Sequence, residues 1–450
     1  MEFESSSLSR ETEAIMRSGV KPVHYTWTAT IHTPEGDFPA MKVLQIDRLR
    51  DFENNFGPVV MATLVLGLGT YAKRIWPQTN LEVTLTRRPL AEIGDTVVLN
   101  NTAASERFDA VMDENFRSPI VEGNTYNVPD EDTLNRTNMI EVPFQLVNKS
   151  LTRLRMMTVG ATYRNTTGEV ATRLMLTREA KSLQIDNTLI LKGVEMTPAA
   201  NQAQRDHIVI PPGTPLYSVP HHVHTKCGGL YSAGIGSYYE GDYWYIWPVY
   251  DTERWEQAQG KRLTIINVPK NKYPKIERSY MVEGSVITVM ANGNVIFQSD
   301  TESKQLNEGN GVMFANADDL ENNFVQVSGN RAVAARGRSN NEFLALQREN
   351  GLNNIQRSTN PINANPFLEY SKLARRRGEV LNVEWENSDP TLIEPGMPAR
   401  MLYLEGSSLR EIRGLVLKAT EFTRLAGEGM TSTRFITTTV ISLFMSPTQF

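Results

Sequence analysis

The sequence predicts a mainly β protein, a β-rich α+β fold in which a small closed sheet at each end of the chain flanks a mixed α+β region. The first observation is alternation of apolar and polar residues, since residues 25–31 and 41–47 both follow the period of a strand. The second is that this alternation returns from residue 379 onward. The third is that residues 23–115 show no pattern for a helix longer than two turns.

The N-terminal part divides into an arm and a first β-domain. Residues 1–22 are rich in Ser and Glu, with a short helical pattern at 11–17, and are expected to order on a partner. Residues 23–115 are predicted to form a small antiparallel β-domain, either a β-barrel or a strongly bent sheet. Its strands are expected at 25–31, 41–47, 58–66 and 81–86, with turn chemistry at 33–37.

Residues 116–340 are predicted to be the α+β middle region. Its polar ends, 116–140 and 300–340, are expected to be connections. Between them the patterns predict a strand at 151–159, helices at 168–176 and 215–225, an aromatic hairpin at 229–250, and a second hairpin whose turn lies at 291–293. The first helix depends on Val170, Leu174 and Thr177, which fall at helical spacing after cap candidates at 165–167.

The C-terminal part is predicted to be a connector followed by a second β-barrel. Residues 341–377 combine short helical pieces with Asn-rich runs and two prolines. Residues 378–450 are predicted to form the barrel. Its strands are expected at 379–385, 399–404, 412–420 and 433–444, with a tight turn at 394–398.

The aromatic hairpin at 229–250 is the most informative segment. Tyr243, Tyr245 and Trp247 alternate with Trp244 and Ile246, so large side chains point to both faces of the strand. Such a hairpin packs in a core, or else exposes an aromatic platform for a sugar or a base. Whether Tyr239, Trp244 and Trp247 are buried or lie in a groove distinguishes these alternatives.

The strings around this hairpin resemble the central baseplate hub proteins of contractile phage tails, a family related to the hub part of type VI secretion spike proteins. The similar strings are GLYSAGIGSYY (229–239), WYIWPVYDTERW (244–255) and LTIINVPKNKYPKIERS (263–279). The resemblance covers roughly half of the chain, is clearest over 215–279, and is weaker at 55–61 and in the C-terminal strands. It implies two barrels of the tail-tube type in each chain.

The resemblance also implies a structural, non-enzymatic function. Three chains would supply six barrels, so a homotrimer could join a sixfold tail tube to a threefold central spike. The implied partners are the tail tube or tube-initiator protein, the spike protein and other baseplate proteins. The implied location is the baseplate of the virion tail, after synthesis and assembly in the cytoplasm of the host bacterium. A carbohydrate-binding or carbohydrate-cleaving tail protein is the first alternative, and a capsid or portal-proximal structural protein is the second.

Composition excludes several classes of function. The chain has 450 residues, enough for two to four domains, and its net charge of −5 argues against general affinity for nucleic acid. No apolar run approaches the roughly 18 residues that span a bilayer. The opening seven residues are acidic, unlike a signal peptide, so the chain is expected to stay in the compartment that makes it. Its one cysteine, Cys227, excludes an intramolecular disulfide.

The only metal-like cluster is His221, His222, His224 and Cys227. Three of these share one side of a helix, but Pro220 and two glycines bracket the segment and no second set of ligands lies nearby. Histidines that pack in the structure or between subunits are therefore expected, with a metal site as the alternative. Cys227 is expected to be a small buried thiol and not a nucleophile. No metal, cofactor or catalytic residue is predicted.

Two glycine motifs and two basic runs complete the survey. Residues 234–238 lack the closing glycine of a serine-hydrolase elbow, and 67–73 lack the spacing of a phosphate loop and are expected to be a turn between strands. The carboxylates are scattered along the sequence, so no pair of catalytic carboxylates for glycan cleavage is predicted. The basic runs at 374–378 and 331–338 are expected to be solvated, or to line an interface with an acidic partner.

Overall fold

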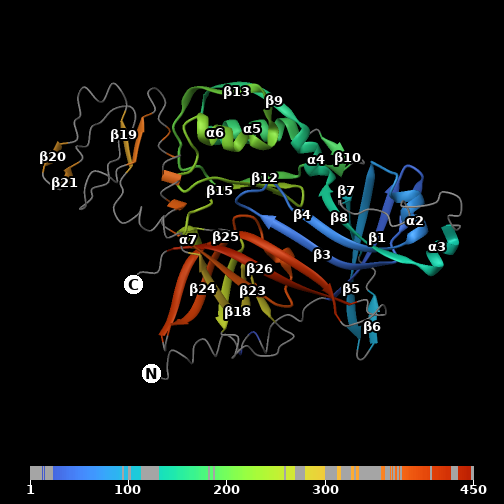
Figure 1. Cartoon of the computed structure of the whole chain (residues 1–450). Helices are drawn as coiled ribbons and strands as arrows, with labels where there is room; N and C mark the ends of the chain where they lie inside the picture. Colours follow the sequence, from blue (N-terminus) through green and yellow to red (C-terminus); the bar gives the residue numbers. More distant parts are fainter. Residues whose placement is uncertain are drawn as a thin grey trace.

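The fold was determined from a computed structural model of the chain (Figure 1). The residues it describes are 24–93, 96–99, 103–112, 131–180, 183–185, 188–257, 260–268, 279–298, 312–315, 326–328, 331–333, 356–359, 378–405, 408–426 and 434–446, with Glu13, Ile15, Asn365, Phe367, Tyr370, Ser371, Ala374 and Arg375. The protein is mainly β, as predicted, and most of its strands belong to one 15-stranded sheet. No helix among these residues is long and apolar enough to cross a bilayer.

Strand pairing closes part of this sheet into a first ring, which lies on the right in Figure 1. Around it run β1 (His24–Thr33), β5 (Leu81–Ile93), β7 (Ala104–Met112), β8 (Met139–Asn148), β4 (Val59–Gly67), β3 (Lys42–Asp51), β25 (Ser408–Leu425) and β26 (Phe435–Met445). Alternate residues point inward and fill the ring with apolar side chains, among them Ile31, Leu64 and Phe144. The predicted strands at 25–31, 41–47, 58–66 and 81–86 are confirmed.

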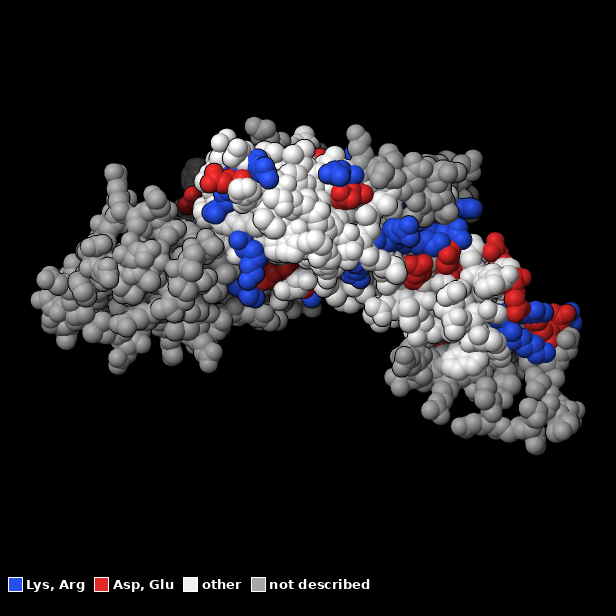
Figure 2. Space-filling view, turned by 90° about the horizontal axis from the view of Figure 1, so that it is seen from above, with Lys and Arg blue, Asp and Glu red and all other residues white. Residues whose placement is uncertain are grey.

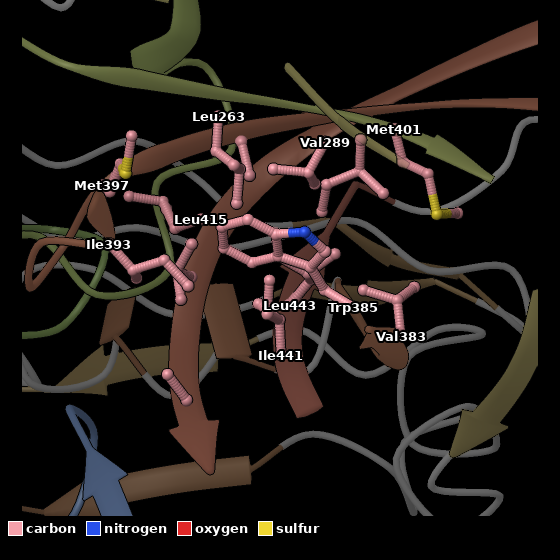
Figure 3. Close-up of a cluster of buried hydrophobic side chains, with 14 of the residues drawn as sticks. Leu263, Val289, Val383, Trp385, Ile393, Met397, Met401, Leu415, Ile441 and Leu443 are labelled. Carbon is pink, nitrogen blue, oxygen red and sulfur yellow. The ribbon is translucent and has the colours of Figure 1, made fainter. Parts of the chain in front are cut away.

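A second ring shares two strands with the first. It consists of β26, β23 (Glu379–Trp385), β18 (Val286–Gln298), β16 (Arg262–Val268), β24 (Pro398–Glu405) and β25. Trp385 lies completely buried at its centre, among aliphatic side chains from all of these strands (Figure 3). The four predicted C-terminal strands are confirmed.

The hairpin of β25 and β26 joins the two rings. The first half of β25 pairs with β24 of the second ring, and its second half pairs with β3 of the first. Each ring therefore combines strands that are far apart in the sequence, and neither is built from one predicted segment alone. The predicted domain boundaries stay a prediction.

A middle region of helices and short strands lies above both rings in Figure 1. It contains α4 (Lys149–Met156), β9 (Thr158–Thr166), α5 (Gly168–Ala180), β12 (Gly193–Met196), β13 (Arg205–Pro215), α6 (Val219–Lys226), β14 (Gly236–Glu240) and β15 (Tyr243–Trp247). Its own apolar core includes Leu154, Met175 and Trp244. The two predicted helices are confirmed. Thr167 caps α5, since its hydroxyl accepts a hydrogen bond of 3.3 Å from the N–H of Val170.

The remaining elements are short. They are β2 (Gly36–Pro39), α2 (Leu68–Thr70), the π-helix η1 (Tyr71–Ile75), β6 (Thr96–Leu99), α3 (Glu131–Thr137), β10 (Gln184–Ile185), β11 (Thr188–Leu189), the 3-10 helices η2 (Leu216–Ser218) and η5 (Pro390–Leu392), α7 (Arg254–Gln257), β17 (Tyr280–Glu283), β19 (Val312–Ala315), β20 (Gln326–Ser328), β21 (Arg331–Val333) and β22 (Gln356–Thr359). Most of the predicted connections at 116–140 and 300–340 lie outside the described residues.

Three local predictions were wrong. Residues 151–159, predicted as a strand, belong largely to α4, because the side chain of Asn148 caps a helix whose Leu151 and Leu154 are buried one turn apart. No turn interrupts β18 at 291–293, where a register shift takes up the irregularity. The predicted turn at 67–73 is helical from Leu68 onward.

Helix α5 lies where it was predicted, but the apolar residues that predicted it face outward. Val170 and Leu174 are 45 % and 52 % exposed, whereas Ala171, Met175 and Leu176 form the buried face of α5. The spacing of Val170 and Leu174 therefore predicted the helix correctly but not the direction of its core. The second apolar face is available for another molecule.

Candidate functional site

The aromatic hairpin connects the core of the middle region to the core of the second ring. β14 and β15 pair around Gly241 and Asp242, which both have positive φ, as a two-residue turn requires. On one face Tyr239, Trp244 and Ile246 enter the core of the middle region, and on the other Tyr238 and Trp247 enter that of the second ring. Large side chains from both faces of the hairpin are therefore buried, each set in a different core.

The three aromatic residues singled out by the sequence are buried. Tyr239, Trp244 and Trp247 are 2 %, 0 % and 2 % exposed. The indole N–H of Trp244 donates a hydrogen bond of 3.0 Å to the hydroxyl of Ser237, and the backbone N–H of Tyr239 donates to the carbonyl of Phe56 at 2.8 Å. These side chains hold the hairpin in place and present no surface to a ligand.

A polar hollow of about 260 Å³ occupies the end of the first ring that lies beneath the hairpin turn. Inward-facing residues of the ring form about half of its wall, and the hairpin with residues 388–395 forms the rest. The lining includes Tyr25, Trp27, Arg48, Arg50, Arg87, Glu240, Tyr245, Asp389, Glu421 and Thr437. The first ring is thus apolar at one end and charged at the other.

Arg50 is the centre of this charged end. Its guanidinium lies 3.3 Å from Glu240 of the hairpin and 2.7 Å from Glu421 of β25. It also donates hydrogen bonds of 2.9 Å to the carbonyl of Ile393 and 2.7 Å to that of Pro390. Burial would lower the pKa of Arg50, but the two carboxylates raise it above its ordinary value. One buried cation therefore links both rings and the middle region.

A more open groove of about 680 Å³ lies on the other side of the turn at 394–398. Its lining comprises Glu195, Met196, Thr197, Tyr243, Tyr245, Ile246, Trp247, Arg254, Gly260, Lys261, Glu394, Pro395, Gly396, Met397 and Pro398. Tyr245 borders both the groove and the hollow. Burial raises the pKa of Tyr245 above its usual value, and the nearby carboxylates of Glu394, Glu240 and Glu195 add to the effect.

Two histidines of α6, His222 and His224, contact the surrounding chain, whereas His221 is exposed. His224 is 2 % exposed; its Nδ1 accepts a hydrogen bond of 3.2 Å from the N–H of Leu230, and its Nε2 lies 3.3 Å from the hydroxyl of Ser371. Burial, aided by the charge of His221, lowers the pKa of His224 to about 4. Nε2 of His222 lies 3.2 Å from the carbonyl of Val209.

Cys227, the last residue of the cluster flagged by the sequence, is half-buried. Its thiol lies 3.8 Å from the same Val209 carbonyl, and burial raises the thiol pKa. In the part of the chain that the structure describes, no group of three or more His, Cys, Asp or Glu side chains could hold a metal ion. The expectation that these histidines pack in the structure or between subunits stays a prediction.

The glycine motifs and the basic runs lie apart and do not form one site. Gly67 and Gly69 pack against α3, where an added Cβ would lie 2.3 Å from Asn135 and 2.4 Å from the carbonyl of Glu131. In the run at 374–378, Arg375 is paired with Glu53 at 3.1 Å and lies over the ring of Tyr250. Residues 376–377 and 334–338 lie outside the described residues.

Sequence alone missed Arg50 and Glu421. Each is a charged residue in an alternating strand, and only its inward position in the strand indicates burial. Their 371-residue separation gave no signal that they meet.

Comparison with known proteins finds similarity among solved structures. No family model matches the chain, and no curated protein matches it. A tail protein from Neisseria meningitidis MC58 is similar with a TM-score of 0.46 and 10 % identity, over 93 % of this chain and 96 % of that one. The 43 kDa tail protein of prophage MuSo2 from Shewanella oneidensis has a TM-score of 0.46 and 8 % identity, over 92 % and 98 %.

A third similar structure comes from a secretion system. The E. coli c3393 protein, described as a type VI secretion component with structural similarity to the T4 tail proteins gp27 and gp5, has a TM-score of 0.37 and 8 % identity, over 89 % of this chain and 73 % of that one.

Proposed function

We propose that the chain is a structural, non-enzymatic component of a contractile phage tail, a homotrimeric baseplate hub that joins the sixfold tail tube to the threefold central spike. The tube or its initiator, the spike and other baseplate proteins are its partners. The virion tail is its location, after assembly in the cytoplasm of the host bacterium.

The single observation that carries the proposal is the pair of closed rings fused through the β25–β26 hairpin. Three chains around a threefold axis would present six such rings, which is the number that a sixfold tube needs. A closed cyclic assembly also avoids the open filament that other repeated contacts produce. The resemblance of residues 215–279 to hub proteins supports the same assignment.

Exposed apolar side chains supply surface for the contacts that a trimer needs. Those of the middle region include Met156, Val170, Leu174, Val209 and Tyr217, which are 77 %, 45 %, 52 %, 50 % and 37 % exposed. Figure 2 shows the molecule from above the view of Figure 1. A broad area of this face carries no charged residue, and Lys, Arg, Asp and Glu lie around its margins. Low charge at the centre and charge at the rim are typical of protein interfaces.

The carbohydrate alternative, in the form that the sequence suggested, requires Tyr239, Trp244 and Trp247 to face a ligand. Their burial removes that platform. A hairpin whose side chains enter two hydrophobic cores fits a structural role.

Native mass spectrometry of the purified chain tests the proposal directly. The expected species has three times the 50.6 kDa of one chain. Electron microscopy of that species should show threefold symmetry, with six ring-shaped densities on one face. A chain that remains a monomer at micromolar concentration, even in the presence of its spike partner, would contradict the hub assignment.

A further inference from the structure

The open groove beside the aromatic hairpin is lined by residues of the middle region and of the second ring. Its floor is one face of the sheet formed by β12 and β15, and its opposite wall is the turn at 394–398 with Lys261. At about 680 Å³ it falls within the range of small-ligand sites, and it lies where the middle region meets the second ring.

Two tyrosines form the aromatic part of this floor. Tyr243 and Tyr245 stand two residues apart on the same face of β15, with ring centroids 6.5 Å apart and planes inclined at 48°. Tyr243 is 36 % exposed, and its ring packs over Gly193 of β12, where an added Cβ would lie 3.1 Å from the ring. No described residue hydrogen-bonds the hydroxyl of either tyrosine, so both remain available to a ligand.

Polar groups border the aromatic side chains of Tyr243 and Tyr245. Glu195 is the cross-strand neighbour of Tyr245 and shares its face of the sheet. On the opposite wall Lys261 and Glu394 form an ion pair of 2.6 Å. Deeper in the groove, Arg254 donates hydrogen bonds to the carbonyl of Gly396 at 2.9 Å and to the hydroxyl of Thr197 at 3.2 Å. Donors and acceptors of both kinds therefore lie around the tyrosines.

We propose that this groove binds a saccharide chain, with Tyr243 and Tyr245 stacking on sugar rings and Glu195, Lys261 and Glu394 hydrogen-bonding their hydroxyl groups. A sugar has an apolar ring face and a rim of hydroxyls, and the groove offers tyrosine faces beside mixed donors and acceptors. The glycan contact is separate from the trimer contacts, so this inference goes beyond the hub function.

A polypeptide partner fits the groove less well. A protein hot spot needs a well-packed pocket for an apolar anchor. The large apolar residues here, Ile246, Trp247 and Met397, are only 1 %, 2 % and 2 % exposed. The floor is also a sheet face and not a free strand edge, so an extended peptide finds no row of backbone groups to pair with.

Titration of the full-length protein with the hexamers of N-acetylglucosamine and of glucose tests the proposal by calorimetry and by saturation-transfer NMR. Saturable binding of at least one of these probes is expected, with a dissociation constant of about 1 mM or below. Tyr243→Ala and Tyr245→Ala should each weaken that binding by about tenfold, because each removes one stacking surface. Tyr243→Phe should retain most of the affinity.

Val282→Ala is the control, since Val282 is 42 % exposed, lies outside the groove and is not among the apolar residues offered for trimer contacts. It should bind the hexamer as the parent does. All variants should keep the parent's oligomeric state and circular dichroism spectrum, which separates failure of this inference from failure of the hub assignment.

Two results would overturn the proposal. One is the absence of saturable binding to both hexamers at 5 mM, a concentration of about five times the expected constant. The other is binding that Tyr243→Ala and Tyr245→Ala leave unchanged. If those variants instead lose only the association with a tail protein, the groove is a protein interface and not a glycan site.

Discussion

Nε of Arg50 lies 2.7 Å from Oε1 of Glu421, which joins the N-terminal strand β3 to the C-terminal strand β25 inside the first ring. Their side chains are 3 % and 10 % exposed, and the same guanidinium reaches Glu240 of the aromatic hairpin. An ion pair that is shielded from water resists salt, but losing one member leaves the other charge without compensation.

Replacement of Arg50 by Met should destabilise the protein by about 3–5 kcal/mol, because Glu240 and Glu421 would lose the cation that contacts them and keep only the neighbouring Arg48. The urea midpoint measures the effect. Arg413→Met is the control, since Arg413 pairs with Glu256 and Glu411 at the surface, where such pairs contribute about 1 kcal/mol or less. Equal effects of the two changes would show that the Arg50 cluster is not an essential link.

Trp244→Ala should cost about 3–5 kcal/mol, because it removes a fully buried ring and the hydrogen bond to Ser237. Expression yield and melting temperature report the loss, and trimer formation should fall with it. Its neighbour Tyr243 is the matched control, because Tyr243→Ala changes an exposed side chain of the same strand and should cost about 1 kcal/mol or less. A Trp244→Ala protein that melts like the parent would mean that the hairpin is not core.

Gly414→Ala should disrupt the hairpin shared by the two rings. An added Cβ at this position of β25 would lie 1.7 Å from the backbone carbonyl oxygen of Phe444 in β26, so the strands must separate. A loss of about 1–3 kcal/mol or more is expected. Hydrogen exchange should be faster in both strands. Gly260→Ala has open space around its Cβ and should leave exchange unchanged there.

Acidic pH should lower the free energy of unfolding, because His224 is neutral in the folded protein and is protonated in the unfolded chain. Burial lowers the folded-state pKa of His224 to about 4, below its ordinary value of 6.5. The unfolded chain therefore binds the proton more readily between these pH values, and stability falls as the pH falls from 6.5 toward 4. The 2.5-unit difference corresponds to at most about 3 kcal/mol.

Comparison of the parent with His224→Gln isolates this contribution from that of the carboxylates. The urea midpoint of the variant should change less between pH 7 and pH 4.5. His207→Gln, at an exposed position of β13, is the control and should follow the parent. If the urea midpoint falls equally with pH in the parent and in both variants, His224 has no such role.

Local pattern predicted most strands because each alternates along its own length. Residues 379–385 were predicted with the bounds that β23 has, since Leu381, Val383 and Trp385 point to one face. The error at 151–159 arose because the apolar residues of the whole run show no decisive period, although Leu151 and Leu154 have helical spacing. The Asn148 cap was the signal that favoured a helix.

The sequence by itself determined the β character of the chain, its α5 and α6 helices, and the hairpin with large side chains on both faces, because these properties depend on residues close together in the chain. Only the tertiary structure decided that β3 pairs with β25, that Arg50 meets Glu240 and Glu421, and that Tyr243 and Tyr245, and not Trp244, border a groove. The period of a strand specifies which side chains share a face. Which face meets water depends on distant segments that pack against it, and no local pattern contains that information.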